Sequence, residues 1–443
     1  MNLKHALLLV VAIGCTALPI AGQFYGDRTG GWLMVDFRAY YCAASAVSRH
    51  VNPYFAQSLH ACESRPSPPY YRAPANVTVP APYPPYVPAL LYPLTLLPFG
   101  AAAVVWWAIL GASLLIAVYA LARVTQQPWV LAWAVLALSL GLTSLSSGNL
   151  LPVCVAALLV AARCAQRGYL PAAALAVAVA MVEPQIALPA ALAAFIRYPA
   201  IRLILVLTFA LLGAVSLVSG GLARNIAYLT TVIPAHALAE VSRDNQYSLS
   251  TVVAALGVPD GRAVLIGGIS YAIVAAIGVY VAVRLARDRF DPAFALLVPP
   301  AFALLGGSFV HTVEIAAAVP ACLLLLARAP AYRGALLLSL ILLAVPWMFA
   351  TSAVLFLAPF FPVAYLVYVL GRRDRALAIA AALTSLALIA MLSNLALQPA
   401  AHAVAHHVVR PPIDPRLAEA SWRAFVLGNS TNRPVMWLLR LPT

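Results

Sequence analysis

The sequence predicts an all-α membrane protein that crosses the bilayer many times. Of its 443 residues, 64% are hydrophobic and 9% are charged, a balance that no soluble domain needs in order to fill its core. The apolar residues fall in long runs, many of them near the roughly 20 residues with which a helix spans a bilayer. Arginines separate these runs in short clusters, as in the loops of a polytopic protein.

The apolar runs predict about eleven to thirteen transmembrane or half-membrane helices. The first run resembles the core of a signal peptide, but no small-residue cleavage site follows, so we expect an uncleaved anchor with its N-terminus inside the cell. The run at 186–195 is too short to span, so we expect a half-helix buried against protein. The runs are 6–21, 99–122, 129–145, 150–162, 170–182, 186–195, 203–218, 263–283, 293–305, 310–326, 335–350, 354–370 and 376–397.

The arginines orient these helices, because short cytoplasmic loops carry an excess of Arg and Lys. If the runs alternate in direction, every basic cluster between them falls on the cytoplasmic side, and this agreement supports the predicted topology. The clusters are Arg123, Arg163/Arg167, Arg197/Arg202, Arg284/Arg287/Arg289, Arg328/Arg333 and Arg372/Arg373/Arg375.

Three longer segments, 22–98, 219–262 and 398–443, fall on the opposite, extracytoplasmic side. We therefore expect a transmembrane domain over residues 1–397, which includes the first two segments as loops, and an extracytoplasmic tail over 398–443. The chemistry is expected on this side. Prolines between 66 and 88 predict extended or polyproline structure, either docked as a lid through its tyrosines or free as a surface loop.

Composition excludes several functions. The net charge of +14 comes almost wholly from scattered arginines, which do not form a nucleic-acid-binding face. Lys4 is the only lysine, so the chain has no P-loop and cannot itself drive transport with ATP. No Asp-x-Asp pair is present to hold a metal-bound nucleotide diphosphate. An enzyme working outside the cytoplasm would then take its activated group from a lipid phosphate in the membrane.

Two of the six cysteines fall in the first outer segment. Cys42 and Cys62 are candidates for a disulfide, which would close a loop of about twenty residues and stabilise the fold by about 3 kcal/mol. Two free thiols are an equal alternative, because sequence does not show geometry.

Asp36 is the leading catalytic candidate. It lies in VDFRAYY at 35–41, directly after an apolar helix. Placing a carboxylate near a low-dielectric surface costs free energy, so its presence there indicates a functional role. Such a carboxylate can take a proton from a hydroxyl as a general base. The structural alternative is an interface residue paired with Arg38 or capping the next helix.

Polar residues near the apolar runs are weaker candidates. Glu183 and Gln185 flank Pro184, where a functional pair and a polar turn before proline are equally good interpretations. His311 and Glu314 share one helix face and are expected to hydrogen-bond a phosphate or sugar, or else to form a satisfied core pair. A His and a Glu make an incomplete ligand set, so no metal site and no cofactor are predicted, and metal dependence stays open. The tail histidines His402, His406 and His407 favour a solvated helix.

Several short motifs resemble those of a known family. They are Asp36-Phe37 with Tyr40-Tyr41, Asn52-Pro53-Tyr54, Tyr83-Pro84-Pro85, Tyr92-Pro93-Leu94, Leu97-Pro98-Phe99 and Trp106/Trp107, with weaker matches at Gly148-Asn149, Pro184-Gln185 and Asn245-Gln246-Tyr247-Ser248-Leu249. Together they resemble the bacterial integral-membrane glycosyltransferases of family 87, the polyprenyl-phosphate-mannose-dependent α-mannosyltransferases with the GT-C fold.

The resemblance implies a catalytic Asp at position 36, which deprotonates an acceptor hydroxyl while the lipid phosphate departs with inversion at the sugar. The leaving phosphate needs cationic or hydrogen-bonding partners, and Tyr40, Tyr41 and Tyr83 are expected to contact the sugar. The other candidate substrate-binding residues are Arg38, Asn149, Glu183, Gln185, Arg243, Asn245, Gln246, Arg262, His311 and Glu314.

The resemblance predicts a glycosyltransferase of the bacterial inner membrane, with its active site outside the cytoplasm. Its partners would be a polyprenyl-phosphate sugar, a lipid-linked or glycan acceptor and the bilayer, but no nucleic acid. The resemblance favours mannose as the donor sugar. Glu183 stands where the family often has Lys, so arabinose or another hexose stays open. The alternatives are a non-enzymatic glycolipid or lipid transporter and a glycan polymerase-like enzyme, which takes a lipid-linked oligosaccharide.

Overall fold

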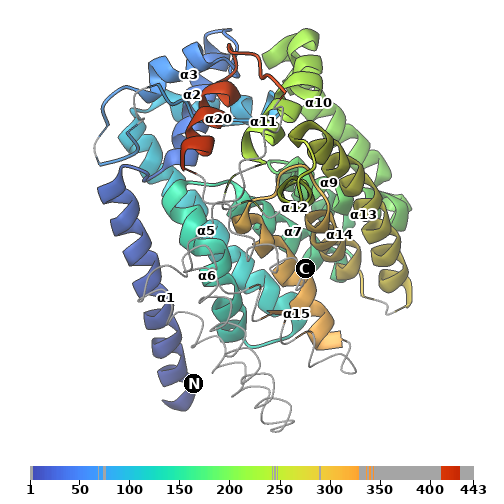
Figure 1. The fold of residues 1–443 in the computed structure, drawn as a ribbon. Helices are drawn as coiled ribbons and strands as arrows, with labels where there is room; N and C mark the ends of the chain where they lie inside the picture. Colours follow the sequence, from blue (N-terminus) through green and yellow to red (C-terminus); the bar gives the residue numbers. More distant parts are fainter. Residues whose placement is uncertain are drawn as a thin grey trace.

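The structure, a computed structural model, describes residues 3–67, 69–72, 76–241, 243, 246, 248–288, 291–328, 336, 339–340, 343 and 411–429. Within these ranges every regular element is a helix, and β-structure is limited to two isolated bridges. The expected all-α membrane protein is thereby confirmed (Figure 1). The predicted helices at 354–370 and 376–397, and most of 335–350 and of the tail, lie outside the described residues.

Most helices follow the predicted apolar runs closely. Two of them extend nine residues past the predicted ends at 21 and 218. The run at 310–326 is helical only from Thr312, so His311 does not share a helix face with Glu314 as expected, because its backbone is extended in a β-bridge with Gln246. In the first half of the chain the helices are α1 (Leu3–Gly30), α2 (Val35–Ser48), α3 (Ala56–Glu63), α4 (Tyr86–Leu91), η1 (Tyr92–Leu96), α5 (Phe99–Thr125), α6 (Trp129–Ser147), α7 (Leu151–Gln166), α8 (Leu170–Ala180) and α9 (Pro184–Arg197). They are followed by η2 (Pro199–Ile201), α10 (Arg202–Ala227), η3 (Tyr228–Val232), α11 (Ile233–Glu240), α12 (Leu249–Ala255), α13 (Asp260–Asp288), α14 (Ala293–Leu305), η4 (Thr312–Ala318), α15 (Val319–Arg328) and α20 (Ala418–Asn429).

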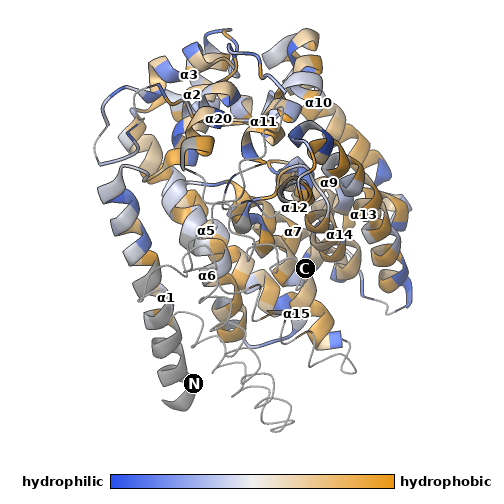
Figure 2. Ribbon diagram, in the orientation of Figure 1, coloured by the Kyte–Doolittle hydropathy of each residue, from blue (hydrophilic) through white to orange (hydrophobic). Residues whose placement is uncertain are grey.

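Three helical stretches in the described part are long and apolar enough to cross a membrane: α5, α13 and the run Pro199–Glu240 that joins η2 to α11. A bent pair within α6 adds a fourth if it forms one span. Side chains on the outer surface of these helices are apolar and exposed, with Val218 of α10 88% accessible, as expected where lipid replaces water. Figure 2 shows this apolar belt on α10 and α13.

Shorter apolar helices fill the interior between the spans. α7, α8, α9 and α14 have 10–17 residues each, and the inner faces of α7 and α14 lie in the largest apolar core cluster. α9 covers the run at 186–195, begins at Pro184 and contains Pro189. The helix is half-length as predicted, but it is buried on one face only, since Leu188, Leu192 and Ile196 are exposed.

One end of the helical bundle is tied together by polar contacts. The Gln166 amide donates to the Val124 carbonyl at 3.1 Å and to the Asp291 carboxylate at 3.0 Å, and Arg328 pairs with the same carboxylate at 3.0 Å. The ends of α5, α7 and α15 and the α13–α14 turn therefore meet. The last turns of these helices and of α13 carry Arg123, Arg163, Arg287 and Arg328. Four arginines that the sequence predicts on one side of the membrane therefore lie at the same end of the bundle.

The segments predicted to lie outside gather at the opposite end, where α2, α3, α11 and α20 cluster (Figure 1). A disulfide joins Cys42 of α2 to Cys62 of α3, which settles the pairing that sequence left open. Residues 77–81 of the proline-rich stretch are buried, and the Thr78 N–H donates to the Ser421 hydroxyl of α20 at 2.9 Å. This part of the stretch is docked and not a free loop.

Candidate functional site

A cavity of about 860 Å³ lies between this outer end and the interior helices. Its wall combines residues of α1, α2, α6, α9, η3, α11, α13 and α20 with the segments at 79–84 and 303–314. A volume in this range suits a drug-sized ligand or larger. The cavity is therefore the place in the described structure where substrate chemistry can occur.

Asp36 lines one end of the cavity, in the first turn of α2. Its Oδ2 atom accepts hydrogen bonds from the Ser147 hydroxyl at 2.8 Å and from the Asn149 side-chain amide at 3.2 Å. Both bonds go to the same oxygen, and no bond to Oδ1 occurs among the described residues. The carboxylate is thus held by two donors while one oxygen stays available to a ligand.

The turn after α6 explains why these groups meet. Gly148 ends α6 with a left-handed φ of 80°, a conformation that glycine adopts without strain. A Cβ atom there would lie 2.5 Å from the Cβ of Phe37, so α2 packs directly on the turn. The Met34 N–H also donates to the Ser146 carbonyl at 2.7 Å. The turn therefore fixes Ser147 and Asn149 against Asp36.

A second polar group lines another part of the cavity wall. Glu240, at the end of α11, accepts from the Arg243 guanidinium at 3.2 Å and lies 3.3 Å from Nε2 of His311. The indole N–H of Trp422 in α20 donates to the same carboxylate. Burial alone would lower the pKa of His311, but the adjacent Glu240 carboxylate more than offsets this and raises the pKa. The Arg243 guanidinium lies 3.5 Å from the same imidazole and adds positive charge to this part of the wall.

Hydrogen bonds connect the two polar groups through the protein. Starting from Asp36, they run through Asn149 to the Tyr40 hydroxyl at 3.5 Å and on to the Tyr83 hydroxyl at 3.2 Å. Tyr83 donates to Glu183 at 2.9 Å.

From Glu183 the connection continues to the cationic group. The Gln185 side-chain amide donates to the Glu183 carboxylate at 2.7 Å and to the Glu314 carboxylate at 3.2 Å. Glu314 also accepts from the backbone N–H of His311 at 3.0 Å. These hydrogen bonds form one continuous network, so the position of Asp36 is linked to that of His311.

Much of the remaining wall is apolar. Ile186 and Leu188 of α9, Leu229 of η3 and Leu304 of α14 line the cavity. Leu188 is 49% exposed and Leu229 64% exposed, so the cavity reaches the outer surface between these helices. In a membrane this opening faces lipid, since exposed residues on the neighbouring turns are also apolar.

The structure brings together only some of the predicted residues. Asp36, Tyr40, Tyr83, Asn149, Gln185, Arg243, His311 and Glu314 line the cavity. Glu183 and Gln246 lie behind its wall, 2% and 1% exposed, where Gln246 donates to Glu240 at 2.9 Å. Their place is to support residues that line the cavity. Asn245 lies outside the described residues.

Three other candidates lie away from the cavity. The Arg38 guanidinium is 2% exposed and donates to the carbonyls of Cys62 at 3.0 Å and Arg65 at 2.7 Å, so it satisfies the end of α3 and is buried away from the cavity. The Tyr41 hydroxyl donates to the Leu97 carbonyl at 2.8 Å. Arg262 is exposed on α13. These positions favour structural roles for Arg38 and Tyr41.

Sequence reasoning missed His236 and Glu240, as well as Asp27, Ser147 and Trp422, all of which line the cavity. His236 and Glu240 carry a readable signal, since a His and a Glu four residues apart in the second outer segment share a helix face. Ser147 and Trp422 carry none, because only the packing of α6 and α20 brings them to the cavity.

Long apolar helices and an internal cavity with an oriented carboxylate define a polytopic membrane protein with an enzyme-like site. The model of Glycosyltransferase family 87 matches residues 82–308, slightly more than half of the chain, and the protein belongs to this family. It is therefore a membrane glycosyltransferase. No curated protein and no solved structure matches the chain. The matched stretch includes Tyr83, Asn149 and Arg243 but begins after Asp36 and ends before His311.

Proposed function

We propose that this protein transfers a sugar, most simply mannose, from a polyprenyl-phosphate donor to a lipid-linked or glycan acceptor, with Asp36 as the general base. Family membership supports glycosyl transfer, and the resemblance of the Asp36 segment supports the donor class. The observation that carries the proposal is the Asp36 carboxylate, which two donors hold at the cavity wall with Oδ1 available.

The reaction needs one proton transfer and one substitution. Asp36 removes the proton from an acceptor hydroxyl, the hydroxyl oxygen forms a bond to the anomeric carbon of the sugar, and the bond from this carbon to the phosphate oxygen breaks. The lipid phosphate leaves with the electron pair, and the anomeric configuration inverts. A carboxylate held by Ser147 and Asn149 loses little entropy in reaching this geometry.

The cavity has suitable places for both parts of the donor. Arg243 presents positive charge to a leaving phosphate and His311 offers a ring nitrogen beside it, where a water-poor site strengthens the interaction. The apolar opening at Leu188 and Leu229 suits the polyprenyl chain, which can then remain in the bilayer. We further propose that the site faces the extracytoplasmic side of a bacterial inner membrane, because the arginine-rich end lies opposite.

Replacement of the carboxylate tests the proposal. Asp36→Asn keeps the size and one acceptor oxygen but removes the base, so transfer from radiolabelled polyprenyl-phosphate mannose should fall by about 10²–10⁴-fold. The assay uses purified protein in detergent with native membrane lipids and glycans as acceptors. Asp288→Asn, an exposed acid at the end of α13, is the matched control and should retain transfer. Turnover by a folded Asp36→Asn protein at the native rate would reject the general base.

A panel of donors separates the remaining alternatives. Incorporation from polyprenyl-phosphate mannose, arabinose or another hexose identifies the sugar. Incorporation only from a lipid-linked oligosaccharide would favour the glycan polymerase-like enzyme. Movement of a glycolipid across a vesicle membrane without any new glycosidic bond would favour the transporter, against which the family match already argues.

A further inference from the structure

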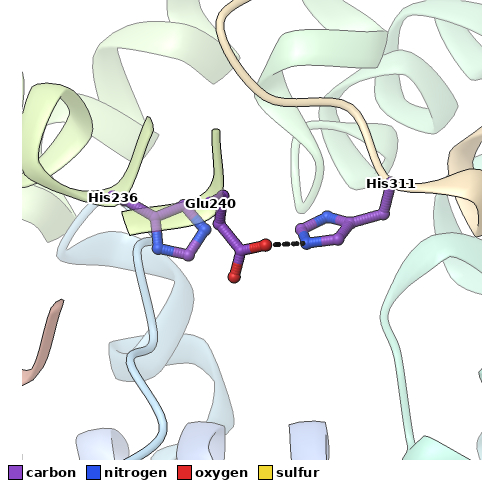
Figure 3. Close-up of side chains that lie close together, drawn as sticks. All are labelled: His236, Glu240 and His311. Atoms are coloured by element: carbon purple, nitrogen blue, oxygen red, sulfur yellow. Dashed lines mark hydrogen bonds and ion pairs between the residues drawn. The ribbon is translucent and has the colours of Figure 1, made fainter. Parts of the chain in front are cut away.

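Three potential metal ligands converge beside the cavity. His236, Glu240 and His311 each offer a ligand atom, and these atoms lie within 4.8 Å of one another. Figure 3 shows the imidazoles of His236 and His311 on either side of the Glu240 carboxylate. All three residues line the cavity, so a ligand in the cavity can reach an ion that they hold.

Two separate elements build this cluster. His236 and Glu240 lie one turn apart on α11, so their side chains project from the same face. An isolated β-bridge pairs His311 with Gln246, and the His311 N–H donates to Glu314 at 3.0 Å. The cluster is therefore positioned by a helix and by a fixed loop, as a preorganised metal site requires.

The donor set and spacing fit a transition metal. A tetrahedral Zn²⁺ with bonds of about 2.0–2.1 Å places neighbouring ligands about 3.3–3.4 Å apart, and His311 Nε2 lies 3.3 Å from Glu240 Oε2. In addition, His236 is 4% exposed, and its buried Nδ1 has no hydrogen-bond partner. A buried nitrogen left in this way loses the free energy of a hydrogen bond, which an ion or a small side-chain rotation can restore.

We propose that His236, Glu240 and His311 bind one divalent transition-metal ion of the zinc type, with an open coordination position toward the cavity. Two histidines and one glutamate are the ligands of several catalytic zinc sites, which leave a fourth position free. Trp422 and Gln246 donate to Glu240 and so orient the carboxylate from outside the ligand set, as supporting residues in metal sites do.

Arg243 is the competitor for this position. Its guanidinium lies 3.2 Å from Glu240 and 3.5 Å from Nε2 of His311, where its charge opposes a second cation. The side chain is 32% exposed and stacks on Trp422 at 4.9 Å, so it has room to move away from Glu240. Removal of Arg243 should therefore strengthen metal binding.

The position of the ion also bears on the reaction. If the proposed donor is correct, the open coordination position would accept a phosphate oxygen and stabilise the leaving group together with Arg243. This last step rests on the proposed function, whereas metal binding itself does not. The two can be tested separately.

Metal binding is measured without any sugar donor. Full-length, tag-free protein in detergent is treated with a chelator, incubated with a small excess of Zn²⁺ or Co²⁺, and separated by gel filtration for elemental analysis. We expect about one ion per chain, and the visible spectrum of Co²⁺ should show a tetrahedral site with nitrogen and oxygen ligands. His236→Ala and His311→Ala should each lower metal affinity by about 10-fold or more.

Three further variants complete the test. Glu240→Gln preserves side-chain size and should also weaken binding, Arg243→Gln should strengthen it, and exposed His50→Ala should leave it unchanged. Equal metal content in native protein and in folded His236→Ala and His311→Ala variants would overturn the proposal, as would no bound metal in the native protein. Transfer at the native rate by metal-free protein would reject only the role of the ion in the reaction, whereas metal binding without any transfer would reject the proposed function alone.

Discussion

At the scale of single residues, burial determines what each charged group can do. Asp36 is only partly buried and keeps one oxygen toward the cavity. Arg38, two residues later, is 2% exposed, and its Nη2 atom donates to carbonyls at the end of α3. The sequence identified both as polar residues at a membrane surface. It did not separate them, because helix periodicity alone does not show which face of α2 meets the cavity.

Glu63 carries a prediction about pH. It is 1% exposed, Oε2 accepts from the Val79 N–H at 3.0 Å, and the buried Oε1 has no partner. Burial raises the pKa of Glu63 to about 8, although the Val79 N–H and Arg38 oppose this. The folded state therefore holds this proton more tightly than the unfolded state, and the contribution of Glu63 to stability declines as the pH rises from about 4.5 to about 8.

Glu63→Gln removes this loss because the amide is neutral at every pH. The variant should melt above the native protein at pH 8, by about 1 °C for each kcal/mol of stability regained in a chain of this length. The difference should shrink toward pH 5. Thermal unfolding in detergent at several pH values measures it, with Asp288→Asn as an exposed control that changes little. A lower melting temperature for Glu63→Gln at pH 8 would show that the native carboxylate is ionised and paired.

At the scale of elements, two turns assemble the site. The turn after α6 sets Ser147 and Asn149 against Asp36, and the segment at 306–311 brings His311 to α11. Helix bounds were predictable within a few residues because apolar runs are strong signals, as at 293–305. The contacts between turns were not, since a turn sequence specifies its own shape but not its partner.

Gly148→Ala tests the first turn. Both Gly148 and Gly168 have left-handed φ angles, 80° and 79°, but a Cβ at Gly148 meets Phe37 at 2.5 Å whereas Gly168 faces open space. Each alanine adds about 1–2 kcal/mol of backbone strain, and only Gly148→Ala adds overpacking of about 1–3 kcal/mol.

Gly148→Ala should therefore lower the melting temperature more than Gly168→Ala does, and it should also reduce transfer because Asn149 shifts away from Asp36. Gly168→Ala is the matched control and should retain transfer once folded. Equal effects of the two variants on stability and on transfer would mean that α2 does not depend on this turn.

At the scale of the whole molecule, the two ends of the bundle hold different features. The arginine-rich ends of α5, α7 and α15 are tied through Gln166 and Asp291, whereas the cavity and the disulfide lie toward the other end. Which end faces the cytoplasm stays a prediction from the arginine rule.

Cysteine labelling tests this orientation. In a variant whose free cysteines are replaced, Asn76→Cys at the cavity end should react with a membrane-impermeant maleimide in intact cells. Arg287→Cys at the end of α13 should react only after the membrane is permeabilised. Both residues are exposed. The opposite pattern would place the site on the cytoplasmic side and would contradict the proposed delivery of the donor.

The sequence by itself determined the membrane class, most helix bounds and the candidate Asp36, because these depend on local hydropathy and on short motifs. Only the tertiary structure decided that Cys42 pairs with Cys62, that Arg38 is buried and donates to carbonyls at the end of α3, and that His236, Glu240 and His311 converge. The physical reason is that pairing and convergence require residues far apart in the chain to meet, and this depends on how whole helices pack.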